Sequence, residues 1–238
     1  MKTKFLFILF IIISYFGYSQ TAVDYFNRGV AKDNQEDYYG AIADFTKAIE
    51  LNPNYSAAYS LRAIAKSKIN DHKGVITDVT IAISLDNGLA VFAECYVIRG
   101  NSKNELQDYY GALSDFNKAI ELKPKHSYAY FSRALTKSNQ KDYYGAIADN
   151  TKAIELNPKY YIAFDNRGIA KFFLKDFNGA ITDFNNSLEI NSNNSLAYYY
   201  RGFSYILLGQ KVSGCLDLSK AGELGDPDAY NVIRKYCQ

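Results

Sequence analysis

Histidine and cysteine, the side chains that most often act in catalysis or bind transition metals, are scarce in this sequence of 238 residues. Neither His72 nor His126 has a cysteine or a second histidine at the spacing of a zinc site. The glycines follow a regular repeat and form no phosphate-binding loop, and the Gly-x-Ser-x-Gly motif of serine hydrolases is absent. We therefore expect no catalytic residue, no cofactor and no metal site.

The three cysteines leave two interpretations open. Cys215 and Cys237 lie on what we expect to be adjacent helices near the C-terminus, so they could form a disulfide. Alternatively, all three cysteines, Cys95 included, are small buried hydrophobic residues.

Arginine and aspartate form the two most regular columns of charged residues. The arginines are Arg28, Arg62, Arg99, Arg133, Arg167 and Arg201. The aspartates are Asp44, Asp78, Asp115, Asp149, Asp183 and Asp217. Successive members of both columns are 34, 37, 34, 34 and 34 residues apart. Both columns therefore indicate one repeat with a single three-residue insertion, near residues 90–92.

The spacing also predicts how the two columns meet. A turn is expected near Glu36, with Arg28 eight residues before it and Asp44 eight residues after it. In an antiparallel helix pair these side chains stand at a similar height, so we expect each arginine to pair with an aspartate of its own repeat or the next. Such pairs can fix register. Ligand binding by the arginines is the alternative.

The repeats are expected at 22–55, 56–89, 93–126, 127–160, 161–194 and 195–228. Each reads as two helices with apolar residues at helical spacing, and Pro53 ends the second helix of the first repeat. The expected N-caps of the second helices are Asp37, Asp71, Asp108, Asp142 and Asp176. We expect the lysines of the first helices to be solvated along one edge with their stems packed; they are Lys32, Lys66, Lys103, Lys137 and Lys171. In each pair of adjacent tyrosines, such as Tyr109-Tyr110 and Tyr143-Tyr144, we expect one ring to pack and the other to be exposed.

At these residues the chain resembles the tetratricopeptide repeat (TPR) family. The pattern is Tyr25-x-x-Arg28-Gly29, then Ala41-x-x-x-Phe45, then Pro53, and residues 142–149 and 152–158 strengthen it. The resemblance implies an all-α, right-handed superhelical solenoid of six helix hairpins, with residues 229–238 as a C-terminal capping helix. Residues 220–227 resemble the junction of the related Sel1-like repeats. One departure is Asn150, which replaces the family's phenylalanine and could bury a polar amide.

The resemblance further implies that first helices line a concave groove that binds a protein or peptide. The groove residues it implies are Phe26, Asn27, Val30, Leu61, Ile64, Val97, Asn101, Phe131, Leu135, Asp165, Asn166, Tyr199 and Phe203. None of these positions holds a lysine, so the carboxylate clamp of chaperone-binding members is not expected. The alternative is that many of these side chains pack between neighbouring repeats or against the chain's own end.

The N-terminal residues are typical of a secretory signal peptide. Lys2 and Lys4 precede an apolar run from Phe5 to Phe16, and small residues favour cleavage after Ser19. An uncleaved membrane anchor is the alternative, although the run is shorter than the ~20 residues of a spanning helix. Residues 20–238 keep 25 of the 27 basic residues against 25 acidic ones, a balance that argues against nucleic acid as a partner.

These features predict an exported, non-catalytic TPR scaffold, secreted or periplasmic and bacterial in style, that binds a protein or peptide. Two alternatives remain open: an accessory subunit of an envelope-assembly or secretion complex, and a sensory ligand-binding module.

Overall fold

The computed structural model describes residues 20–85 and 93–237. The predicted signal peptide, residues 1–19, and the predicted insertion near residues 90–92 lie outside the described residues. Within the described ranges the chain forms thirteen helices and no strand. It divides into two units, Met1–Leu89 and Ala90–Gln238, which are described separately. The all-α prediction is confirmed for this part of the chain.

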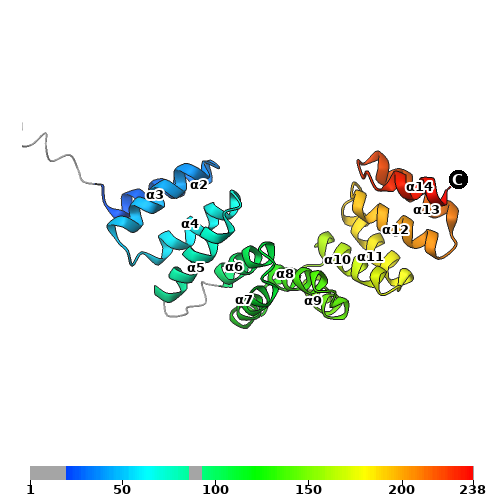
Figure 1. The fold of residues 1–238 in the computed structure, drawn as a ribbon, viewed down its shortest axis with the longest axis horizontal. Coiled ribbons are helices and arrows are strands. Elements are labelled where there is room, and N and C mark those ends of the chain that lie inside the picture. Colours follow the sequence, from blue (N-terminus) through cyan, green and yellow to red (C-terminus); the bar gives the residue numbers. More distant parts are fainter. Residues whose placement is uncertain (1–19, 86–92, 238) are drawn as a thin grey trace, which may run out of the picture. The chain divides into compact units, whose positions relative to one another are not determined.

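The first unit contains two helix hairpins, each formed by a first and a second helix that pack side by side (Figure 1). Its helices are α2 (Ala22–Asn34), α3 (Tyr38–Leu51), α4 (Ser56–Lys68) and α5 (His72–Leu85).

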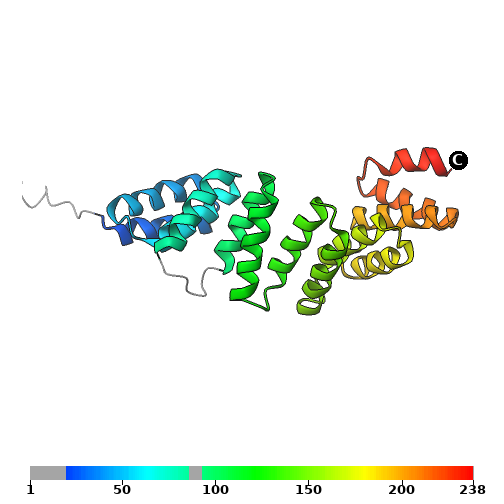
Figure 2. The ribbon, with the colours of Figure 1, turned by 60° about the horizontal axis from the view of Figure 1, so that its bottom comes forward.

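The second unit contains four more hairpins and a short last helix (Figure 2). The hairpin helices are α6 (Ala93–Glu105), α7 (Tyr109–Leu122), α8 (Ser127–Asn139), α9 (Tyr143–Leu156), α10 (Tyr161–Phe173), α11 (Phe177–Ile190), α12 (Ser195–Leu207) and α13 (Lys211–Glu223). The last helix is α14 (Ala229–Tyr236). First helices of successive hairpins contact one another, as α8 contacts α10 and α10 contacts α12.

The turn inside each hairpin has the same conformation. One residue in each adopts a left-handed backbone with φ between 59° and 79°: Glu36, Asn70, Gln107, Lys141, Lys175 and Gly209. The next helix then begins at a capping aspartate in five of the six hairpins. The five predicted N-caps are confirmed, since each carboxylate accepts a hydrogen bond of 2.9 or 3.0 Å from the amide of the glycine three residues later. The left-handed turn residue and the N-cap, which both act locally, therefore reverse the chain direction.

Close contact between the two helices of a hairpin depends on small residues facing aromatic rings. A Cβ atom added to Gly29, Gly100 or Gly168 would lie 2.7 or 2.8 Å from a ring atom of the phenylalanine on the second helix. These phenylalanines, Phe45, Phe116 and Phe184, are fully buried. Alanine therefore fits at this position only where the second helix carries a smaller residue, as in the second and fourth hairpins.

The fourth hairpin buries a polar amide at this contact, at the position where the sequence suggested it. Asn150 is fully buried, and neither its Oδ1 nor its Nδ2 has a hydrogen-bond partner among the described residues. The equivalent pair in the second hairpin is Ala63 and Val79, both fully buried, so valine is compatible with an alanine on the first helix. The amide at position 150 therefore lowers the stability of this hairpin.

Asn150→Val is expected to raise the free energy of unfolding by about 1–3 kcal/mol, because it removes two unpaired polar atoms from the core. Urea denaturation followed by circular dichroism would measure the change. The reverse substitution, Val79→Asn, is the matched control and should cost a similar amount. An unchanged or lowered stability of Asn150→Val would show that the amide is satisfied in solution.

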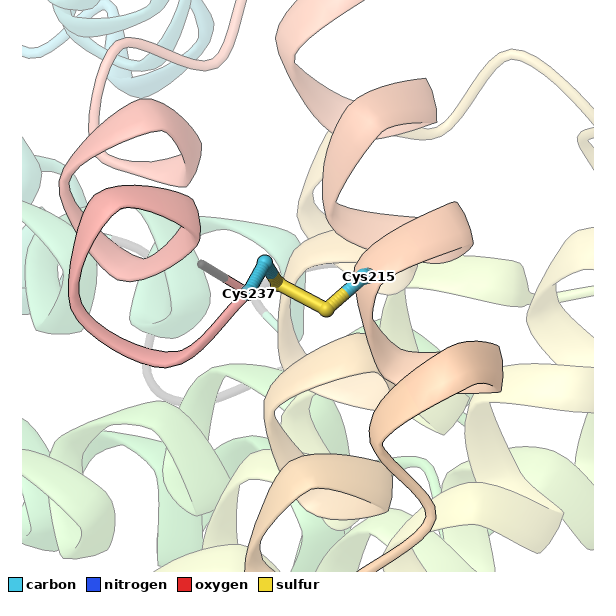
Figure 3. The surroundings of a disulfide bond; sticks show 2 residues. All are labelled: Cys215 and Cys237. Carbon is cyan, nitrogen blue, oxygen red and sulfur yellow. A yellow bond between two sulfur atoms is a disulfide. The ribbon is translucent and has the colours of Figure 1, made fainter.

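The C-terminal helix covers the end of the last hairpin. α14 packs on α13 and α12, where Ala229 joins Leu218 and Ala221 in a buried cluster. Gly222 leaves room for the ring of Tyr230, which lies 2.8 Å from where a Cβ would be. Figure 3 shows that a disulfide joins Cys215 of α13 to Cys237 at the end of α14. Of the two cysteine interpretations, the disulfide holds for this pair, and Cys95 is buried.

Candidate binding face

The arginine and aspartate columns meet within each hairpin. Every arginine donates to both carboxylate oxygens of the aspartate sixteen residues later, and the Nη2–Oδ1 distances from the second to the sixth hairpin are 2.6–2.8 Å. The guanidinium group also lies 4.7–5.5 Å from the aromatic ring three residues before it. All six aspartates are buried. Among the two arrangements expected, the structure has the pairing within one repeat.

The expectation that the first-helix lysines are simply solvated is wrong. In the first five hairpins the lysine Nζ lies 2.8 or 2.9 Å from Oδ2 of the same buried aspartate. A buried carboxylate has lost its hydration, so it binds two cations in place of water. In the sixth hairpin Tyr205 occupies the lysine position, and Asp217 pairs with Arg201 alone among the described residues.

The arginines also connect neighbouring hairpins. The Nη1 groups of Arg62 and Arg167 donate to the hydroxyls of Thr46 and Thr151, each at 3.0 Å. Arg133 and Arg201 donate in the same way to Asn117 and Asn185, at 2.6 and 2.7 Å. These guanidinium groups therefore hold the scaffold together, and their hydrogen bonds are already used.

Three of the predicted groove residues are buried and do not line an open surface. Val97 is 2% exposed and packs in the core around Phe116. Asp165 and Asn166 are 6% and 8% exposed. The reason is that this side of each first helix faces the start of the next first helix, so these side chains fill the junction between hairpins.

Two other predicted groove residues are half-buried for the same reason. Phe26 stacks on Tyr55 at a centroid distance of 4.9 Å, and Phe131 meets Tyr160 at 5.1 Å.

The remaining predicted groove residues differ in exposure. Within the first unit, Val30 and Leu61 pack on the cluster around Phe45, Ile64 is half-buried, and Asn27 is exposed. In the second unit, Asn101 donates to the hydroxyl of Tyr128 at 3.2 Å, and Leu135 is exposed. Tyr199 and Phe203 are half-buried, and the ring of Phe203 lies 5.9 Å from that of Tyr236, the last residue of α14.

The fifth hairpin has a polar junction where its neighbour has an aromatic one. Asp165 and Asn194 occupy the positions of Phe131 and Tyr160, 34 residues later. Asn194 Nδ2 donates to Asp165 Oδ2 at 2.7 Å, whereas Asp165 Oδ1 has no hydrogen-bond partner among the described residues. Loss of solvation by burial raises the pKa of the Asp165 carboxyl.

A raised pKa at Asp165 makes the protein lose stability as the pH rises through that pKa, because the ionised form is disfavoured in the fold. Below the ordinary carboxyl pKa of about 4 the folded and unfolded chains both hold the proton. Asp165→Asn should therefore raise the free energy of unfolding by about 1 kcal/mol at pH 7, and this gain should disappear toward pH 4. Urea denaturation of both proteins between pH 4 and 7 would check it. A gain that does not depend on pH would contradict the assignment.

Six of the large apolar side chains that are exposed in the second unit lie on first helices. They are 38–51% exposed and comprise Tyr128 and Leu135 of α8, Ile162 and Phe173 of α10, and Leu196 and Leu207 of α12. We call these six residues the first-helix stripe. Their positions within a helix differ by seven or eleven residues, which places them on one face. Five of the six are absent from the predicted groove residues, although this spacing and the 34-residue period could have identified them.

Among the described residues, no three side chains of histidine, cysteine, aspartate or glutamate are grouped so that they could hold a metal ion. Within the same ranges no helix is long and apolar enough to cross a membrane. The stripe itself consists of aliphatic and aromatic side chains, so it offers apolar contact.

Comparison with known proteins identifies the repeat. One model of the tetratricopeptide repeat matches residues 22–55, and a second model with the same description matches residues 93–126 and 127–160. These ranges coincide with the first, third and fourth repeats expected from the sequence. No curated protein sequence matches the chain.

Solved structures share the fold at low sequence identity. YrrB, described as a TPR protein with an unusual peptide-binding site, is 22% identical with a TM-score of 0.65, and the match covers 80% of this chain and 97% of YrrB. Pseudomonas aeruginosa pilF is 14% identical with a TM-score of 0.75, over 90% of this chain and 97% of its own. MamA is 22% identical with a TM-score of 0.65, and the match covers 72% of this chain and 92% of MamA. Residues 22–55, 93–126 and 127–160 are therefore tetratricopeptide repeats, and the chain has an all-α superhelical repeat fold like these neighbours.

Proposed function

We propose that this protein is an exported, non-catalytic scaffold that binds a segment of another protein on the first-helix stripe. The observation that carries the proposal is the exposure of six large apolar side chains on three consecutive first helices. Side chains of this size contribute about 1.5–3 kcal/mol each when they become fully buried, and about half of that remains available here. The helices that present them are already ordered, so binding costs little conformational entropy. The peptide-binding site described for YrrB, which shares the fold, supports the same class of function.

Export is the second part of the proposal, and it rests on the sequence of residues 1–19. We propose cleavage after Ser19 and a secreted or periplasmic location. Expression of the full chain in a bacterium, followed by fractionation and N-terminal sequencing, would test it. A mature chain that begins at Gln20 outside the cytoplasm is the expected result, whereas an intact Met1 in the cytoplasmic fraction would contradict export.

Exposed side chains on the second helices support one alternative. In this alternative the protein is an accessory subunit that docks in an envelope complex through its second helices. Tyr39, Tyr110 and Tyr144 are 74–83% exposed at equivalent positions of α3, α7 and α9, and Val212 and Leu216 are exposed on α13. Their partners in sequence, Tyr109 and Tyr143, are half-buried, so the expected division of each tyrosine pair is confirmed. Within the second unit, the competing residues are therefore Tyr110, Tyr144, Val212 and Leu216.

Selection of peptides from a display library for binding to residues 20–238 can distinguish the first-helix stripe from the surface on the second helices. Peptides selected by the protein would be measured by fluorescence anisotropy against Phe173→Asp and Leu207→Asp. Each substitution should weaken binding at least about tenfold, because a charge replaces an apolar contact of about 1.4 kcal/mol or more. Tyr110→Asp is the matched control, an equally drastic change on a second helix, and should leave binding unchanged. Binding that is lost only in Tyr110→Asp would assign recognition to the second helices.

A further inference from the structure

The exposed positions of the first helices change in polarity along the second unit. The residue that follows the first position of each first helix is Glu94 in α6, Tyr128 in α8, Ile162 in α10 and Leu196 in α12. All four are exposed. The series runs from a carboxylate through a phenol to two aliphatic side chains, so the face becomes less polar from α6 to α10 and stays apolar at α12.

The last residue of each first helix repeats this order independently. It is Glu105 in α6, Asn139 in α8, Phe173 in α10 and Leu207 in α12, and all four are exposed. A position between the two series agrees, since it changes from Asn101 in α6 to apolar residues in the later helices. The polarity therefore belongs to the face as a whole.

Charge at the polar end is only partly neutralised. Glu94 pairs with Lys123 at 2.7 Å, and this hydrogen bond lowers the pKa of the Glu94 carboxyl. His126 Nε2 lies 3.8 Å from Glu94, but burial lowers the pKa of this imidazole and keeps it neutral near pH 7. Glu105 forms no ion pair with the described part of the chain. The lysine nearest to it in the helix, Lys103, is bound to Asp115. The α6 end therefore presents a negative charge.

We propose that the ligand of this face is a linear polypeptide segment that is apolar at one end and basic at the other. Its apolar end lies on α10 and α12, and its basic end lies on α6 beside Glu105. This inference rests on the proposed function and adds the chemistry of the partner and its direction. Neighbouring helices pack roughly 8–10 Å apart, so four first helices span roughly 24–30 Å, the length of about seven to nine extended residues. In the opposite direction a basic side chain would lose its hydration against Phe173 and Leu207, and binding would weaken.

Three labelled peptides of ten residues test the proposal in fluorescence anisotropy. The first has four leucines at one end and three lysines at the other, the second has three glutamates in place of the lysines, and the third has three serines. The basic-ended peptide should bind at least about tenfold more tightly than the acidic-ended one at low salt, and the serine peptide should lie between them. Glu105→Lys should abolish or reverse this order, whereas Glu121→Lys, an exposed charge reversal on the second helix α7, should not change it.

A photoreactive group at either end of the basic-ended peptide then reports direction. Cross-links from the apolar end should map to α10 and α12, and those from the basic end to α6. If the three peptides bind equally, or if Glu105→Lys leaves their order unchanged, the inference is wrong while the proposed function stands. If none of them binds, or Leu207→Asp has no effect on binding, the apolar stripe itself is not the site and the proposed function fails.

Discussion

Replacing Asp183 by alanine is expected to lower the free energy of unfolding by about 3–5 kcal/mol. Asp183 is 1% exposed, and it accepts hydrogen bonds from Arg167 at 2.7 Å and from Lys171 at 2.8 Å. Both cations are themselves largely buried, so removal of the carboxylate leaves two positive charges close together in a medium of low dielectric constant. Urea denaturation at pH 7 would measure the loss.

The sixth hairpin provides the matched control for this prediction. Asp217→Ala removes the same carboxylate, but it strands only Arg201, because Tyr205 replaces the lysine. Asp217→Ala should therefore lower the free energy of unfolding by less than Asp183→Ala does. A triple variant, Asp183→Leu with Arg167→Met and Lys171→Leu, should recover much of the stability, since no buried charge remains. Equal losses for Asp183→Ala and Asp217→Ala would show that the lysines contribute nothing.

Breaking the disulfide between Cys215 and Cys237 is expected to cost about 3 kcal/mol of stability in the C-terminal cap. The bond closes a segment with a sequence separation of 22, and it holds a helix of eight residues. A helix of that length is not stable on its own in water, so α14 depends on its packing on α13 and on this bond. Reduction should therefore release α14 and expose Leu218 and Tyr199.

Hydrogen exchange with and without dithiothreitol would locate this effect. The amides of α14 and of the facing side of α13 should lose protection from exchange. The amides of α2–α5 should keep their protection, because these helices belong to the other unit. The double variant Cys215→Ser, Cys237→Ser should resemble the reduced protein and should no longer respond to dithiothreitol. If reduction leaves the exchange of α14 unchanged, packing alone holds the cap.

The repeat period, the helix pairs and their N-caps could be predicted from the sequence because they depend on local chemistry. An aspartate before a helix caps the amides three residues later wherever the helix lies, so Asp37 and its four equivalents needed no tertiary information. The pairing of Arg28 with Asp44 is almost as local, since a short turn fixes the height at which the two side chains meet.

The exposed face of the first helices could not be predicted in the same way. Helical spacing shows which residues share a face, but the rotation of a hairpin against its neighbour decides which face is covered. That rotation buries Val97, Asp165 and Asn166 at junctions and leaves Ile162 and Phe173 exposed. Of the groove residues that the family resemblance implied, Val97, Asp165 and Asn166 are buried, whereas Asn27 and Leu135 are exposed.

In this protein the sequence by itself determined the number of hairpins, their turns and the charged pair inside each one. The tertiary structure alone decided that Lys171 and its equivalents share the buried aspartate, that Asp165 lies in a closed junction, and which apolar side chains remain in contact with water. The physical reason is distance along the chain: capping and turns act over three to five residues, whereas burial is set by side chains much farther away, as Asn194 lies 29 residues from Asp165.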